Sequence, residues 1–233
     1  MIKRDRIKLG LQILRFLPYS IWFNFHYLSF HQAIRLPILL YKPHLLRCGG
    51  TIRINSPIKF GMIRLGFRKV SLYPNTGIVW ENKGYIEFNG NTLIGNASAL
   101  SVGKRGKLVL GNNFWATCSL KIACHKYIEF SNNVLVGWDC LFADSDFHTL
   151  QTKNGSTKGI GEIHIGDNNW FAMQSVCLKN AKTPSYCVCS ARTLINKDFS
   201  QLEEKIMLSG NPAKIVKTDI YHDWINDKIH DND

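Results

Sequence analysis

The stretch IGDNNWFAMQSVCLKNAKTPSYCVCSARTLI, residues 165–195, decides the fold of this chain. Small or apolar residues recur in it at every sixth position, and the residue that follows is often small or polar. The repeated positions are Ile165, Phe171, Cys177, Thr183, Cys189 and Ile195. A period of six predicts short strands joined by tight corners, in which each inward side chain stacks on its equivalent in the next coil.

The same period continues toward the N-terminus. It places three trios six residues apart: Phe88, Ile94 and Leu100; Leu110, Ala116 and Ile122; and Phe130, Val136 and Phe142. Asn-Asn or Asp-Asn pairs at 112–113, 132–133 and 167–168 suit corners, because asparagine tolerates positive φ. Three hexads make one triangular coil, so the sequence predicts a β-solenoid.

The largest interruption of the repeat lies between Phe142 and Ile165. A loop of this length in a solenoid is usually functional. An antiparallel β-structure is the alternative fold, and residues 85–88 would fit its period of two. The run from 165 to 195 would not, and we therefore predict the solenoid.

Composition sets broad limits on the class of protein. The 233 residues suit one domain, with or without a small appendage, and the net charge of +12 indicates an anionic partner or simply a solvated basic surface. The seven cysteines show no repeating spacing, so we expect reduced thiols and a cytoplasmic protein. The basic start is followed by a stretch too polar for a membrane span, with no cleavage site.

Three segments resemble the hexapeptide-repeat acyltransferases, in particular the sugar and polysaccharide O-acetyltransferases. They are residues 133–140 with Asp144-Ser145-Asp146-Phe147-His148, residues 165–172, and residues 194–198 with the ending Ser209-Gly210-Asn211-Pro212-Ala213-Lys214. The resemblance covers about residues 91–217. The sequence departs from the family pattern at residues 180–189, at Ala172 where glycine is usual, and at Asn196 where threonine is usual.

The resemblance implies an all-β fold: a left-handed parallel β-helix over residues 51–217, with an N-terminal cap or docking region over 1–50 and a short helical tail over 218–233. It implies transfer of an acetyl or similar acyl group from acetyl-CoA to a sugar hydroxyl in surface polysaccharide biosynthesis. It also implies a homotrimer whose ligand sites lie between neighbouring chains. An N-acyltransferase acting on an amino sugar nucleotide and a non-catalytic binding module remain as alternatives.

The resemblance implies that His148, at the start of the long loop, is the general base. This role suits the chemistry, because a hydroxyl is a poor nucleophile at neutral pH and histidine titrates near that range. Asp144 or Asp146 is expected to orient its imidazole. Trp170 is expected near His148 and against the ligands, and backbone N–H groups around Ala172 are candidates to stabilise the oxyanion. The remaining candidate contacts to coenzyme A are Ser190, Lys197 and Lys214.

Two other chemistries are weighed and set aside. A related β-helix family binds zinc through three histidines, but its His-x4-His pair is absent here, so we expect no metal. A cysteine nucleophile is the rival of direct transfer, yet Cys140, Cys177 and Cys189 fall at repeat positions that should point inward. We expect no acyl-enzyme.

Residues 1–50 allow two interpretations. Their basic and apolar residues could form an amphipathic helix on the inner face of a membrane, near a lipid-linked acceptor. They could instead cap the open end of the solenoid, which any solenoid must cover. We favour the cap, and no nucleic-acid partner is expected.

Overall fold

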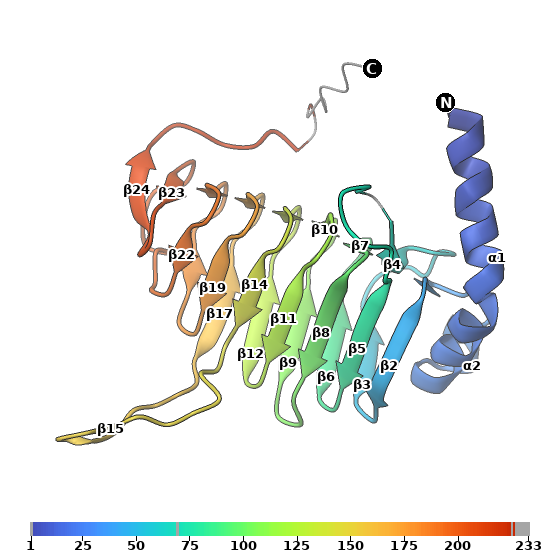
Figure 1. Cartoon of the computed structure of the whole chain (residues 1–233), viewed down its shortest axis with the longest axis horizontal. Coiled ribbons are helices and arrows are strands. Elements are labelled where there is room, and N and C mark those ends of the chain that lie inside the picture. The colour runs from blue at the N-terminus through green and yellow to red at the C-terminus, as the bar shows by residue number, and fades with distance from the viewer. Residues whose placement is uncertain (1, 69, 225, 227–233) are drawn as a thin grey trace.

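The computed structural model describes residues 2–68, 70–224 and 226, and it shows a parallel β-helix of three sheets (Figure 1). The first sheet contains β1 (Ile38–Leu40), β4 (Ile63–Phe67), β7 (Thr92–Gly95), β10 (Phe114–Ala116), β13 (Leu135–Val136), β18 (Trp170–Phe171), β21 (Val188–Cys189), β23 (Met207–Ser209) and β24 (Lys214–Lys217). The second contains β2 (Pro43–Cys48), β5 (Ile78–Asn82), β8 (Ser98–Val102), β11 (Lys121–Cys124), β14 (Leu141–Ala143), β19 (Val176–Leu178) and β22 (Leu194–Ile195). The third contains β3 (Thr51–Ile54), β6 (Tyr85–Phe88), β9 (Lys107–Leu110), β12 (Tyr127–Phe130), β17 (Glu162–Ile165) and β20 (Lys182–Thr183).

The predicted left-handed parallel β-helix is confirmed as the fold class. Each coil contributes one strand to each sheet, and equivalent strands pair in parallel and in register. In the third sheet, for example, Phe88, Leu110, Phe130 and Ile165 lie side by side, and each is at most 1% exposed. The residues of the sixfold repeat therefore form the core, as the pattern predicts.

Phenylalanines from successive coils stack in the core. The rings of Phe114 and Phe130 lie 4.8 Å apart, those of Phe130 and Phe142 lie 4.7 Å apart, and those of Phe142 and Phe171 lie 5.2 Å apart. The edge-to-face geometry of these three pairs is a favourable one for aromatic rings. Large rings from successive coils thus fill the triangular section without a central gap between sheets.

The asparagine pairs form the corner before the first sheet. Asn113, Asn133 and Asn168 adopt φ values of 58°, 57° and 57°, which asparagine tolerates better than most residues. Their side-chain amides also stack. Asn113 donates to Asn133 at 3.0 Å, and Asn133 donates to Asn168 at 3.0 Å. This ladder aligns successive corners and confirms the predicted turn positions.

The β-helix begins earlier than the predicted boundary at residue 51. β1 and β2 lie within the predicted cap region, yet they pair in parallel with β4 and β5. The hexad texture is weak in this first coil, because its residues follow prolines and a bulge interrupts β2 after Leu45. The sixfold pattern therefore does not reveal this first coil.

A long helix covers the N-terminal end of the β-helix. α1 (Ile2–Tyr27) is followed by the short α2 (Phe30–Ala33), and α1 packs against β1 (Figure 1). Phe23 of α1 is fully buried, and its ring lies 5.2 Å from that of Trp80 in β5. Among the described residues, neither helix has the length and apolar character needed to cross a membrane.

The chain closes the other end with a hairpin. β23 extends the first sheet, and β24 pairs with it antiparallel. The chain then returns along the outside of this sheet, where the rings of His222 and Trp170 lie 5.5 Å apart (Figure 1). Residues 218–224 and 226 form no helix, and the rest of the predicted helical tail lies outside the described residues.

Candidate active site

The interruption of the repeat forms an arm that projects from the β-helix between β14 and β17 (Figure 1). Its outer part is an antiparallel ribbon of β15 (Gln151–Thr152) and β16 (Gly155–Ser156). At its root, Ser145 forms an antiparallel bridge with Ile160, and the N–H of Asp146 donates to the carbonyl of Gly159 at 2.8 Å. The two chain segments of the root are therefore held together.

His148 lies at this root, two residues beyond Asp146, and its side chain is exposed. The preceding Phe147 has a φ of 61° and packs its ring 4.8 Å from that of His125. Across the root, Gly159 faces the His148 carbonyl closely, since a Cβ there would lie 2.7 Å from that oxygen. Backbone packing on both sides thus fixes the segment from which the imidazole projects.

Asp144 does not orient His148, contrary to one of the two predicted assignments. Its carboxylate is fully buried and accepts hydrogen bonds from the backbone N–H groups of His125, Lys126 and Tyr127 at 2.7, 2.7 and 2.8 Å. These three donors lie at the corner between β11 and β12. Asp144 therefore stabilises a turn of the preceding coil, a role that sequence spacing does not reveal.

Asp146 forms an ion pair with Lys179, which follows β19 in the next coil, at 2.5 Å between Nζ and Oδ2. Both side chains are about one-third exposed. Within the described part of the chain, no hydrogen bond joins Asp146 to the His148 imidazole. Asp146 thus connects the start of the arm to the coil beside it. Of the two predicted aspartates, it is the one nearer to His148 in the sequence.

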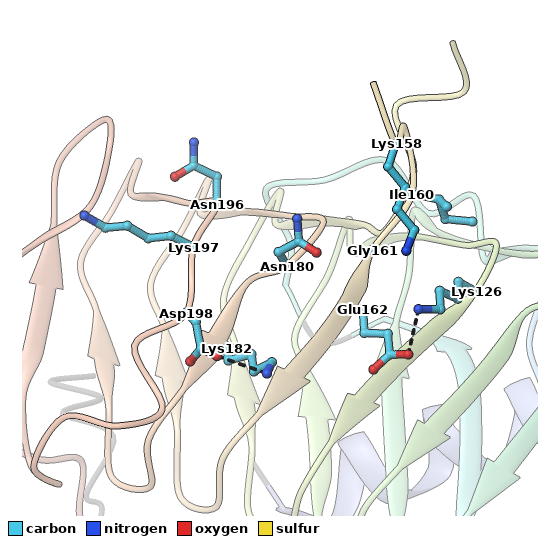
Figure 2. A pocket seen from close by; sticks show the side chains of 10 residues that line it. All are labelled: Lys126, Lys158, Ile160, Gly161, Glu162, Asn180, Lys182, Asn196, Lys197 and Asp198. Atoms are coloured by element: carbon cyan, nitrogen blue, oxygen red, sulfur yellow. Dashed lines mark ion pairs between the residues drawn. The ribbon is translucent and has the colours of Figure 1, made fainter. Parts of the chain in front are cut away.

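A cleft of about 550 Å³ opens beside the root of the arm (Figure 2). Its lining comes from the root and from three successive coils: Lys126, Lys158, Ile160, Gly161, Glu162, Asn180, Lys182, Asn196, Lys197 and Asp198. Lys126 pairs with Glu162 at 2.8 Å, and Lys182 pairs with Asp198 at 3.0 Å. Hydrogen bonds from Ser200 lower the pKa of Asp198 to about 2, so this carboxylate is ionised at neutral pH.

Two lysines of the cleft have no carboxylate partner among the described residues. Lys158 lies on the arm, and Lys197 lies over the ring of Phe199 at 5.1 Å. Lys197 was predicted from the sequence as a phosphate contact. Lys126, Lys158 and Lys182 were not, because they come from separate coils and no local pattern connects them.

The other predicted coenzyme A residues lie on a different side of the β-helix. Trp170 is in β18, and Ala172 lies at the corner after it. Both line a mainly apolar hollow of about 270 Å³ with Gly137, Trp138 and Met173. The N–H of Ala172 donates to the Cys189 carbonyl at 2.8 Å, so that group is engaged in the sheet and is not available to an oxyanion.

Ser190 and Lys214 occupy the C-terminal part of the same side. The Ser190 hydroxyl donates to Ser209 at 2.7 Å, and Lys214 is exposed on β24. His148, in contrast, lies at the corner between the second and third sheets. Trp170 belongs to β18 in the first sheet, so within one chain the structure does not bring it near His148 as predicted.

The thiols of Cys140, Cys177 and Cys189 are poor nucleophiles in this structure. Burial raises the pKa of Cys140 to about 12, and burial raises the pKa values of Cys177 and Cys189 well above the ordinary value. All three side chains are fully buried, as their repeat positions predict. A thiolate is the reactive form, so covalent catalysis by these residues is disfavoured.

No group of three or more His, Cys, Asp or Glu side chains among the described residues is arranged to hold a metal ion. His164 in β17 lies between two carboxylates. Its ring nitrogens are 3.3 Å from Glu129 and 3.1 Å from Glu162. It is therefore part of a polar ladder on the third sheet.

No family model and no curated protein matches this chain. Three solved structures resemble it: a polySia-specific acetyltransferase (16% identity, 78% of this chain and 82% of that one, TM-score 0.46), a hexapeptide transferase family protein from Anaplasma phagocytophilum (14%, 76% and 78%, 0.41), and a variant of an N-acyltransferase from Bacillus cereus in complex with dTDP and coenzyme A (12%, 78% and 80%, 0.43). Because these identities and TM-scores are low, the function has to be argued from the residues of this chain.

Proposed function

We propose that this chain is an acyl-CoA-dependent O-acyltransferase that moves an acetyl or similar acyl group to a sugar hydroxyl in surface polysaccharide biosynthesis. The observation that carries the proposal is that His148 is exposed at the root of the arm, where Gly159 faces its backbone carbonyl, and that Lys158, next to Gly159 in the chain, lines a cleft rich in lysine. An exposed imidazole on this segment can accept the proton of an acceptor hydroxyl as that hydroxyl attacks a thioester.

The charges of the cleft suit a phosphate-bearing co-substrate. Lys126 and Lys182 are neutralised by their carboxylate partners, whereas Lys158 and Lys197 keep their charge available. Ammonium groups bind phosphate as point charges, without a fixed geometry. We therefore assign Lys158 and Lys197 to the phosphates of coenzyme A, and Asp146 to positioning the arm through Lys179.

A neighbouring chain would complete the site. The arm with His148 leaves the corner between the second and third sheets, whereas the hollow around Trp170 lies on the first sheet, so the two can meet only across an interface between chains. In the proposed homotrimer, the arm of one chain reaches the Trp170 side of the next. The N–H that follows Ala172, that of Met173, then replaces the engaged N–H of Ala172 as the candidate oxyanion donor.

The test is release of free coenzyme A from acetyl-CoA in the presence of a panel of sugars. His148→Ala should lower turnover by about 10²–10⁴, the usual loss for a general base, while coenzyme A binding stays close to wild type. Cys140→Ser is the matched control and should retain most of the activity. Wild-type turnover in His148→Ala, or an acylated cysteine detected by mass spectrometry, would disprove this mechanism. Linkage analysis of the product distinguishes an ester from the amide of an N-acyltransferase.

A further inference from the structure

The helical cap carries a second apolar face that the β-helix does not cover. The buried residues of α1, such as Ser20, Phe23 and Asn24, face β1 and account for its capping role. On the other side, apolar residues recur at spacings of three or four, which places them on one face of the helix. They are Leu11, Leu14, Pro18, Trp22 and Phe25, with Ile21 beside them.

This face continues beyond α1 into an end surface. Phe30 in α2, whose ring lies 5.9 Å from that of Phe25, extends this face, and Ile34 after α2 and Leu46 in β2 are exposed at the same end of the molecule (Figure 1). The large apolar side chains of the surface are between 41% and 66% exposed. A shallow apolar hollow of about 400 Å³ lies between Pro18, Tyr19, Trp22 and Leu45. A cap needs only one apolar face, so this second contiguous patch indicates an interaction site.

The charge of the chain is concentrated in the same region. Residues 1–80 contain thirteen Lys and Arg residues and a single acid, Asp5, so they carry a net charge of +12, equal to that of the whole chain. Residues 81–233 contain sixteen charges of each sign and are neutral. Within residues 10–68 and 70–80, whose basic side chains the structure describes, no ion pair joins a Lys or Arg to a carboxylate.

The basic and apolar residues of the end surface alternate closely. Arg15, Arg35 and Arg47 are exposed, and each directly follows an exposed apolar residue of the surface: Leu14, Ile34 and Leu46. Apolar side chains that enter the acyl boundary, beside arginines that reach anionic headgroups, are what an interfacial helix requires. Tryptophan and tyrosine at its middle suit the headgroup level.

We propose that the end surface docks the protein onto an anionic lipid bilayer. α1 then has two roles, since one face closes the β-helix and the opposite face lies on the membrane. The two interpretations of the N-terminal region are therefore compatible. In a trimer with parallel axes, three end surfaces would face one plane and strengthen binding without new contacts. The proposal does not depend on acyl transfer.

Co-sedimentation with vesicles tests this docking. Wild type should sediment with phosphatidylcholine vesicles that contain phosphatidylglycerol, much less with pure phosphatidylcholine, and less again as salt is raised. Trp22→Glu with Phe25→Glu should weaken binding about tenfold or more, because two charges replace inserted rings. Val216→Glu, on β24 at the opposite end and 53% exposed, is the matched control and should bind like wild type.

Charge is tested separately. Arg15→Gln with Arg35→Gln should lower affinity for anionic vesicles about tenfold, whereas Lys104→Gln with Arg105→Gln, away from α1, should have little effect. Circular dichroism and acyl transfer to a soluble sugar should stay at wild-type level in every variant. Equal binding to neutral and anionic vesicles, or wild-type binding of the double glutamate variant, would overturn the proposal. So would a fall in oligomer mass in that variant without loss of vesicle binding, because the surface would then join chains.

Discussion

Asp144 shows how a residue inside a functional motif can serve the fold instead. It is fully buried, and its carboxylate accepts three backbone N–H groups of the preceding coil. Asp144→Asn removes the charge and leaves buried donors poorly satisfied, so we expect a loss of about 2–4 kcal/mol in the free energy of unfolding. Urea denaturation measures this loss. His148→Ala, exposed on the same segment, should unfold like wild type.

Lys179 is expected to affect the rate of the reaction rather than stability. It holds Asp146 at the start of the arm, and both side chains are partly exposed, so the pair contributes little to folding. Lys179→Met should lower kcat severalfold or more while the KM for acetyl-CoA changes little, because the base is then less well placed. An unchanged kcat would show that the arm keeps its position without this ion pair. Lys179→Arg should restore most of the activity.

Asn24 connects helix α1 to the edge of strand β1 that has no neighbouring strand in the sheet. Its side chain accepts from the Ile38 N–H at 3.1 Å and donates to the Ile38 carbonyl at 2.7 Å, as a neighbouring strand would. Asn24→Ala should cost about 2–4 kcal/mol, since it leaves backbone groups at a buried edge without partners. Thermal unfolding checks this, with His26→Ala as control. His26 bonds the Cys48 carbonyl from an exposed position, so its loss should cost under about 1 kcal/mol.

The whole molecule is predicted to work only as an assembly. Light scattering at micromolar concentration should give three times the chain mass of 26.6 kDa. If the site combines His148 of one chain with the Trp170 side of another, then mixing His148→Ala with Trp170→Ala chains should recover activity that neither variant has alone. A monomeric mass would contradict the trimer. Lack of recovery in verified mixed trimers would instead place each complete site within one chain.

The distribution of charge also belongs to the molecule as a whole. The net charge of +12 suggests a basic surface, but composition does not say where on the molecule that surface lies. A solenoid keeps chain order along its axis. The difference in net charge between residues 1–80 and residues 81–233 therefore becomes a difference in charge between the two ends of the β-helix. Residues that are early in the chain therefore remain together at one end, next to α1 (Figure 1).

The sequence by itself determined the β-helix, its core and the position of the arm. Each coil contacts only its neighbours, so a local period of six is sufficient to set which side chains point inward, and asparagine pairs mark the corners. It also indicated which histidine would lie on the interruption, since a long insertion must leave the stack. The repeat is weak in the first coil, so the sequence pattern does not predict that coil.

Only the tertiary structure decided which polar groups meet. Asp144 bonds backbone N–H groups from residues 125–127, the cleft draws lysines from several coils, and Ala172 donates its N–H to the next strand. These contacts depend on how coils of unequal length align across the arm, and no sequence spacing encodes that alignment. The separation of Trp170 from His148 has the same origin, because a triangular coil turns nearby positions in the chain toward different faces.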